Sequence, residues 1–232
     1  MEQIIHLRSD SKEIIIKLIR DDKSVTEKTI TDQDLMRILR TNEKERYILP
    51  APLFRDEENE GYIPGMLCGE KHGKTCKGIF FVPAALNFMD IVGEKSYMPY
   101  PSLIFVLNAS SGSIVQSKCF ALKEKDIDEL RSDSKLYAFP YGNVLYSDAH
   151  ICWGSNKLTD MHDFIKLRSA IALFFSASSN KDYVYRGKTY AEKYGKYETF
   201  IRKVQKRKSF PDDALVESPC VKKLGELLSD FY

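Results

Sequence analysis

Residues 139–156, which read FPYGNVLYSDAHICWGSN, place one cysteine, Cys152, behind a proline, an asparagine and a tight polar turn. A loop of this kind presents a thiol for acyl transfer. A thiol with an ordinary pKa of about 8.5 is only about 3% thiolate at pH 7, yet it is nucleophilic enough to take an acyl group from another thioester. A histidine base beside it is not strictly required. The alternative is that Cys152 is a small buried hydrophobic residue at the end of a strand.

Two neighbours of Cys152 each have a functional and a structural interpretation. His150 stands two residues away, so on an extended segment it lies on the same side and, when charged, would lower the thiol pKa. Otherwise it is an exposed surface histidine. Trp153, the only tryptophan, is either a packing anchor beneath the loop or an aromatic residue that faces a partner.

Strand patterns precede this stretch. Residues 3–9 and 13–20 are β-rich and predict a hairpin, and Thr31 with Asp34 forms a capping-box pattern that predicts a helix through about Arg40. Residues 41–77 are rich in charge, Gly and Pro, which favours loops. Three more strands are then predicted, and the last two are joined by a hairpin loop at 108–112. These strands, which indicate an antiparallel meander, are 78–82, 102–107 and 113–122.

Helical spacing of apolar residues follows the cysteine. Asp160 can cap a helix whose inner face carries Phe164, Leu167, Ile171 and Phe174. A second, basic helix is interrupted by Gly195, and a short terminal helix starts at Ser218 and Pro219. The inner face of the second helix is formed by Tyr190, Tyr194, Tyr197, Ile201 and Val204.

Strands followed by helices, without regular alternation, predict an α+β fold. We expect three parts: an N-terminal strand-strand-helix segment over 1–55, a core with the cysteine loop over 56–180 and a basic helical segment over 181–232. With 232 residues, of which 43% are hydrophobic, the chain can bury one core. The amino terminus lacks an apolar signal core, and the longest uncharged apolar run, 79–86, is too short to span a membrane. We therefore expect a soluble, cytoplasmic protein.

The cysteines and the charge distribution favour ordinary structural roles over a metal site or a nucleic-acid contact. Five cysteines, without close pairs, indicate reduced thiols, and the spacing of Cys68, His72 and Cys76 favours a polar loop over a zinc site because no second ligand pair follows. We predict no cofactor and no metal. Residues 181–209 carry a local charge of +7 in a chain of net charge +2, which favours a solvated helix face over contact with nucleic acid or an acidic partner.

Strands that lead through a Pro-containing loop to a cysteine and then to an amphipathic helix resemble the ubiquitin-conjugating-enzyme-like (UBC-like) fold. In that family a His-Pro-Asn triplet precedes an Ile-Cys pair by a short turn. Here Phe139-Pro140 and then Asn143 precede Ile151-Cys152. Phe139 stands in place of the histidine, two residues separate Pro140 from Asn143, and Asn143 lies nine residues before Cys152, one more than usual.

A more specific set of residues is similar to prokaryotic UBC-like family D, the PRTRC system protein B group. The likeness covers roughly residues 78–180. It is carried by Pro101-Ser102-Leu103, Cys119-Phe120-Ala121-Leu122, Leu136-Tyr137, Asn143-Val144 and Cys152-Trp153-Gly154-Ser155.

The resemblance implies a carrier of a ubiquitin-like protein, found alongside a ThiF-like adenylating enzyme, a small ubiquitin-like protein and a JAB-type metalloprotease. Cys152 would receive the carboxyl-terminal acyl group of the modifier from the activating enzyme and pass it to an amine. Asn143 would stabilise the oxyanion or hold the flap, which is the segment that leads from the meander to the cysteine. Alternatively, it would simply cap a turn. Asp148 and Asp160 would deprotonate an incoming lysine, or act only as a turn residue and a helix cap.

Two alternatives stay open at this point. The altered His-Pro-Asn element is also typical of a UBC-like binding or scaffold module, in a PRTRC-type plasmid or mobile-element system, that has lost transfer activity. A nucleic-acid-associated accessory protein is the other alternative, suggested by the basic helix over 186–208 and its interleaved tyrosines.

Overall fold

The computed structural model describes the backbone of three N-terminal strands and, with side chains, residues 63, 65–91, 93–179 and 193–229. The chain divides into two compact units, residues 1–46 and residues 47–231, and each is described by itself. The predicted boundaries after residues 55 and 180 stay predictions, because the residues around both lie outside the described ranges.

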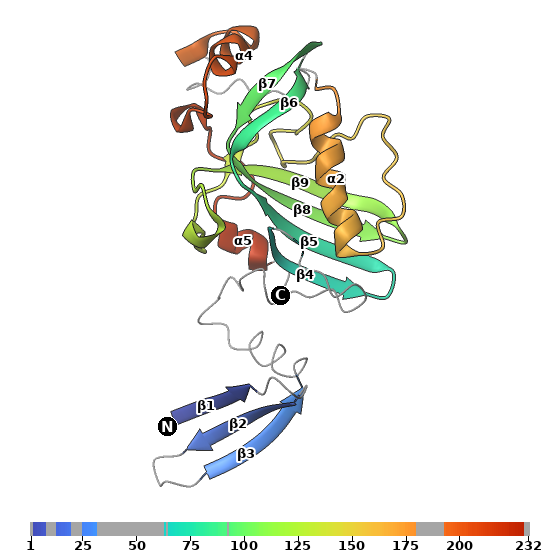
Figure 1. Ribbon diagram of the computed structural model, residues 1–232, viewed down its shortest axis with the longest axis vertical. Helices are drawn as coiled ribbons and strands as arrows, with labels where there is room; N and C mark the ends of the chain where they lie inside the picture. The colour runs from blue at the N-terminus through green and yellow to red at the C-terminus, as the bar shows by residue number, and fades with distance from the viewer. Residues whose placement is uncertain are drawn as a thin grey trace. The chain divides into compact units, whose positions relative to one another are not determined.

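The N-terminal unit contains a three-stranded antiparallel sheet in the order β1-β2-β3 (Figure 1). Its strands are β1 (Glu2–Leu7), β2 (Glu13–Ile19) and β3 (Val25–Thr31). The predicted hairpin is therefore confirmed, while β3 was not anticipated. Thr31 ends β3, and the rest of the helix predicted up to Arg40 lies outside the described residues.

The larger unit is built on a five-stranded antiparallel sheet in the order β10-β9-β8-β5-β4. The strands are β4 (Met66–His72), β5 (Thr75–Val82), β8 (Ser102–Ser110), β9 (Ser113–Leu122) and the short β10 (Tyr137–Ala138). A separate hairpin of β6 (Ala85–Ile91) and β7 (Glu94–Tyr100) is inserted between β5 and β8. The three predicted meander strands are confirmed, and the predicted α+β class with them.

The prediction of loops throughout 41–77 is wrong for β4 and the start of β5. Met66, Leu67 and Cys68 are buried against the core, whereas the far end of β4 is charged and exposed. Pairing with β5 gives this segment its backbone hydrogen bonds despite its unfavourable composition. Gly69 has a packing reason, because a Cβ there would lie 2.7 Å from the ring of Phe164.

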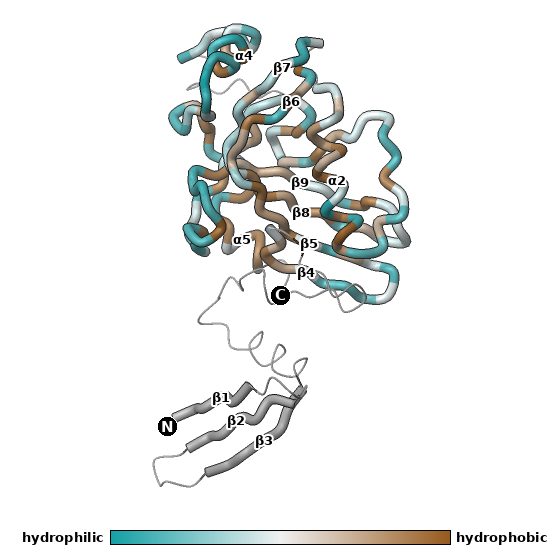
Figure 2. The backbone as a smooth tube through the Cα atoms, in the orientation of Figure 1, coloured by the Kyte–Doolittle hydropathy of each residue, from teal (hydrophilic) through white to brown (hydrophobic). Residues whose placement is uncertain are grey.

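The centre of the core is β8, whose first six residues are all buried. Successive side chains of a strand point to opposite faces, so both faces of the sheet are covered at β8. Figure 2 shows hydrophobic residues along this strand and polar ones at the turn between β4 and β5. The turn from β8 to β9 has positive φ angles at Ser111 (50°) and Gly112 (77°), as a tight two-residue hairpin requires.

Helix α2 (Phe164–Ser176) contacts β5, β6 and β8 (Figure 1). Its buried side confirms the predicted apolar stripe for Leu167, Ile171 and Phe174, while Phe164 is partly buried. The rings of Phe174 and Phe105 lie edge to face, with centroids 5.2 Å apart. The helix thus fixes one face of the sheet beside the cysteine loop.

The C-terminal residues pack onto the same unit. In α4 (Tyr197–Gln205), as predicted, Tyr197, Ile201 and Val204 are buried, and Phe200 contacts the ring of Tyr141 at 6.3 Å. The part of the predicted helix before residue 193 lies outside the described residues.

The predicted terminal helix exists as α5 (Leu224–Ser229), but it begins six residues after Ser218. Residues 216–222 instead run beside β10, with Ala138 N donating to Val216 O (2.8 Å) and Ser218 N to Leu136 O (3.0 Å). Single-turn 3-10 helices occur at Ile127–Glu129 and Asp212–Ala214. Within the described ranges, no helix combines the length and apolarity needed to span a membrane.

Candidate functional site

The cysteine loop runs along the edge of the sheet. After β10, residues 149–151 come back beside β9: Cys119 N donates to Ala149 O, and Ile151 N donates to Ser117 O, both at 3.0 Å. Ala149 makes the turn with a positive φ of 61°. Cys152 therefore follows directly after a segment whose backbone is fixed to the sheet.

Cys152 is one of two cysteines that are not buried. It is partly exposed and Cys220 is exposed, whereas Cys68, Cys76 and Cys119 are buried. Burial raises the pKa of Cys68 to about 12 and raises that of Cys119 well above its ordinary value. The buried thiols are thus poor nucleophiles, and Cys152 and Cys220 remain as candidates.

Asn143 is bound to Cys152 through the backbone, because the Cys152 N–H donates to the Asn143 carbonyl at 2.8 Å. Asn143 itself is 8% exposed and has a left-handed φ of 69°. Its side-chain amide donates to the Ser178 carbonyl at 2.9 Å. Asn143 therefore ties the cysteine loop to the chain just after α2, and its part in transfer stays a prediction.

This connection continues to the inserted hairpin. The Ser178 hydroxyl donates to Asp90 Oδ2 at 2.8 Å, and Ser179 N donates to Asp90 O at 2.7 Å. A continuous series of hydrogen bonds thus joins β6, the end of α2, Asn143 and Cys152. Sequence reasoning did not identify Asp90 or Ser178, since contacts between segments so far apart leave no local pattern.

Phe139 and Pro140 occupy the start of the motif. Phe139 is 6% exposed and lies edge to face with Phe174 (5.2 Å) and Tyr141 (5.7 Å). Pro140 is partly buried, and the Tyr141 hydroxyl donates to the Pro99 carbonyl. At the position of the family's histidine this chain therefore has a ring that belongs to the core.

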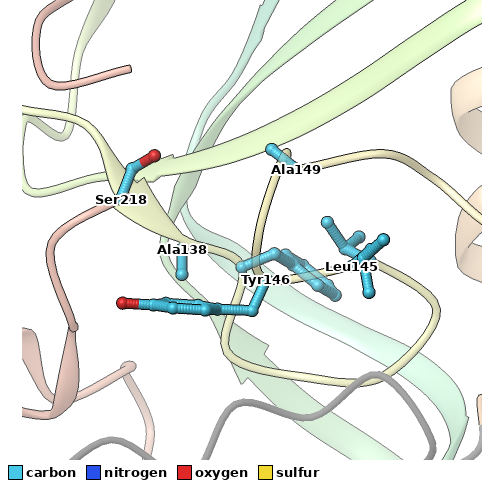
Figure 3. A pocket seen from close by; sticks show the side chains of 7 residues that line it. Ala138, Leu145, Tyr146, Ala149 and Ser218 are labelled. Atoms are coloured by element: carbon cyan, nitrogen blue, oxygen red, sulfur yellow. The ribbon is translucent and has the colours of Figure 1, made fainter. Parts of the chain in front are cut away.

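A small cavity of about 10 Å³ lies behind the loop, with room for about one water molecule. Figure 3 shows side chains from β10, the loop and the C-terminal segment around it. These residues are Ala138, Phe139, Val144, Leu145, Tyr146, Ala149 and Ser218. A cavity of this size does not hold a substrate.

Trp153 packs against the protein, which agrees with the first of its two predicted roles. Its indole N–H donates to the hydroxyl of the buried Ser117 at 2.9 Å. Its ring lies 6.2 Å from that of Phe174 at an interplanar angle of 78°. Both contacts fix the backbone immediately after Cys152.

Asp148 and His150 are exposed and lie in one turn, where Asp148 Oδ1 accepts the His150 N–H at 3.0 Å. Asp148 thus does what its turn interpretation predicts. His150 and Cys152 flank the fully buried Ile151, so the alternation expected of an extended segment is present. A catalytic part for either residue stays a prediction.

The prediction that Asp160 caps the helix is wrong. Asp163 is the N-cap of α2, and its Oδ1 accepts the Lys166 N–H at 2.7 Å. Asp160 is exposed, has a φ of 63° and accepts the His162 N–H through its backbone carbonyl at 2.9 Å. Asp163 lies three residues after the predicted cap, and the helix starts there because the chain makes a turn at Asp160.

Cys68 and Cys76, considered above with His72 as metal ligands, lie on the paired strands β4 and β5. Cys68 is 3% and Cys76 1% exposed, and both belong to the hydrophobic core. Cys68 is opposite Ile79, and Cys76 is opposite Lys71. The predicted polar loop is therefore wrong at these positions, because the two strands bury both side chains.

An antiparallel meander crossed by one helix, with a cysteine loop hydrogen-bonded to β9, is a mixed α+β architecture compatible with the UBC-like fold. The sequence matches the model of prokaryotic E2 family D over residues 61–218. That match covers more than half of the chain, and the protein therefore belongs to this family, as the resemblance implied. No curated protein and no solved structure matches the chain.

Proposed function

We propose that this protein carries a prokaryotic ubiquitin-like protein as a thioester on Cys152. The Cys152 thiolate attacks the thioester carbonyl held by a ThiF-like activating enzyme, and the thiol of that enzyme leaves. An amine then attacks the new thioester, forms an amide and releases the Cys152 thiol. The observation that carries the proposal is a partly exposed cysteine fixed at the edge of the sheet, within the family match.

Position distinguishes Cys152 from the other accessible thiol. Cys220 lies beyond residue 218, where the family match ends, and its sulfur is 3.5 Å from the Ser218 hydroxyl. Cys152 lies inside the match and follows a segment paired with β9. We therefore assign transfer to Cys152 and use Cys220 as the control.

The residues around Cys152 have different roles in this proposal. Asn143 acts as a positioning residue, because its amide already donates to the Ser178 carbonyl. An oxyanion role requires an N–H of that amide to be directed at the thioester carbonyl. His150 and Asp148 stand at the exposed side of the loop, where an incoming amine has access.

A thioester assay on the full chain tests the proposal. The protein is incubated with its cognate ThiF-like enzyme, the ubiquitin-like protein and Mg-ATP, and is then analysed on a non-reducing gel. We expect an adduct that thiol reductant removes and that Cys152→Ala abolishes. Cys152→Ser should give an oxyester that resists reductant, and Cys220→Ala should behave as the wild type. An adduct on Cys152→Ala equal to that of the wild type, or no adduct on the wild type, contradicts the proposal.

A binding module without transfer activity is the second candidate. It is favoured by the buried Phe139 in place of the histidine and by the engaged amide of Asn143. In that case the modifier or its activating enzyme binds the wild type and Cys152→Ala equally, and no thioester forms. Membership of the PRTRC group, with a JAB-type metalloprotease in the same pathway, is a finer proposal that applies to both candidates.

A further inference from the structure

A lysine of β9 lies beside the extended segment that leads into Cys152. Lys118 and His150 are directly opposite each other in an antiparallel bridge. The two backbone hydrogen bonds that join residues 149 and 151 to β9, both 3.0 Å long, fix this register. The side chains of a directly opposed pair share one face of the sheet. Lys118 and His150 therefore project from the same face.

Cys152 projects from that face too. Trp153 donates to Ser117 and packs on Phe174 of α2, so residues 151 and 153 of this segment are on the side of the helix. Because side chains alternate along an extended segment, residues 150 and 152 point away from the helix. In agreement with this, Cys152 is partly exposed, whereas Ile151 is fully buried.

Lys118 can reach Cys152 across the two strands. Cys152 lies two residues beyond His150, so it is the diagonal neighbour of Lys118. Diagonal neighbours in an antiparallel pair are about 7–8 Å apart, a separation that a long side chain spans. On its other side Lys118 is opposite Val106 of β8, which is 6% exposed. Its apolar stem can lie along this part of the core while the ammonium stays at the exposed side of the face.

The ammonium of Lys118 forms no ion pair within the part of the chain that the structure describes. The acidic residue of the cysteine loop is Asp148, and its Oδ1 accepts the His150 N–H at 3.0 Å. A negative charge that develops at Cys152 therefore has a lysine within reach on its own face of the sheet.

We propose that Lys118 stabilises the oxyanion that forms when a thioester at Cys152 is made or broken. This inference rests on the proposed transfer and adds a catalytic residue to it. In each step a nucleophile adds to the thioester carbonyl, whose oxygen becomes negative, and the electron pair returns to the carbonyl as a sulfur leaves. An attacking amine gives its proton to the solvent. Lys118 keeps its proton and donates a hydrogen bond to the oxygen, a contact that strengthens as the charge develops.

Alkylation of Cys152 tests the position of this charge without any partner protein. The full chain with Cys220→Ala is treated with anionic iodoacetate or neutral iodoacetamide at pH 8.5, at which histidine side chains are neutral. Peptide mass spectrometry gives the two rates at Cys152, and their ratio reports the local charge, because the fraction of thiolate cancels. We expect Lys118→Gln to lower the iodoacetate-to-iodoacetamide ratio about threefold. An equal ratio in Lys118→Gln and its parent overturns the proposal.

Lys74→Gln is the matched control in this experiment. Lys74 is exposed in the turn between β4 and β5, and β4 is at the other end of the strand order from β9 and β10. Its charge is more than a Debye length from a site beyond β9 and is screened there. The ratio should therefore stay that of the parent.

Transfer kinetics test the oxyanion role itself. The rate of loading is measured against the concentration of the charged activating enzyme, and the discharge of the loaded protein is measured with propylamine. We expect Lys118→Gln to lower kcat for loading and the rate of discharge about tenfold, with KM unchanged, because a contact made only in the transition state is lost. Lys118→Arg keeps the charge and should restore most of the rate. Circular dichroism checks that each variant is folded.

The outcomes separate this inference from the proposed function. A wild type that forms no thioester overturns the proposed function and the oxyanion role with it. A wild type that loads and discharges at the same rates as Lys118→Gln overturns the oxyanion role alone. A higher KM with an unchanged kcat in Lys118→Gln also overturns it, because such a change assigns Lys118 to binding of the activating enzyme or the modifier.

Discussion

Replacement of Asn143 by alanine and by glycine separates the two physical contributions of this residue. Alanine removes the hydrogen bond to the Ser178 carbonyl and places a Cβ-bearing residue without a polar side chain at a φ of 69°. The lost hydrogen bond costs about 1 kcal/mol. The left-handed backbone costs alanine about 1 kcal/mol more than glycine, even after the greater freedom of glycine in the unfolded chain. We expect the free energy of unfolding to fall by about 2 kcal/mol for Asn143→Ala and by about 1 kcal/mol for Asn143→Gly.

Urea denaturation followed by far-ultraviolet circular dichroism measures both variants. Asn87→Ala is the matched control, because Asn87 lies on the extended strand β6 and its side-chain oxygen accepts the N–H of the adjacent Phe88 at 3.0 Å. It should change the free energy of unfolding by less than about 0.5 kcal/mol. Equal losses for the alanine and glycine variants of Asn143 would refute the argument from backbone strain. Stability like that of the wild type in both would refute the hydrogen bond to Ser178 as a support of the loop.

Three further predictions concern the thiols and the cap. N-Ethylmaleimide should modify only Cys152 and Cys220 in the native protein and all five cysteines in denaturant, as counted by mass spectrometry; fast modification of a third thiol would contradict the burial described above. Asp163→Ala should lower the free energy of unfolding by about 1 kcal/mol through loss of the N-cap. Asp160→Ala should lower it by less than about 0.5 kcal/mol. A larger loss of stability for Asp160→Ala than for Asp163→Ala, measured by urea denaturation, would exclude Asp163 as the cap. Because burial raises the pKa of Cys68 from 9.0 to about 12, its thiol stabilises the fold fully below pH 9, and that contribution is lost as pH rises towards 12. Cys68→Ala should flatten the pH dependence of the free energy of unfolding between pH 9 and pH 12. An unchanged slope would contradict the contribution assigned to the Cys68 thiol.

The sequence predicted those elements whose pattern is local and regular. The meander strands and α2 carry apolar residues at the period of their own structure, so they could be recognised. The strand at Met66–His72 was missed because Gly69 and the charged residues at its end resemble a loop, and only pairing with β5 makes it a strand. The hairpin β6–β7 was missed because much of its apolar surface is exposed rather than buried in alternation.

The candidate site also contains residues that could be predicted from local sequence and contacts that could not. Cys152 could be singled out from its immediate neighbours, because the turn before it and the helix after it are both encoded locally. The partners of Asn143 and Trp153 could not, since Ser178 and Ser117 lie 35 and 36 residues away in the sequence and are brought close only by the fold. Asp160 was wrongly predicted as the cap because the start of the helix depends on the φ angle of a turn, which composition does not give.

The single tryptophan of the chain follows the proposed acceptor cysteine directly, with its indole bonded to Ser117 and packed on Phe174. Tryptophan emission from the unlabelled protein therefore comes from one place only, the peptide next to Cys152. If the proposed transfer takes place, attachment of a modifier there, or its departure, would change the surroundings of that one chromophore. The protein would then carry its own optical reporter, with which stopped-flow fluorescence would follow the proposed loading and discharge in real time.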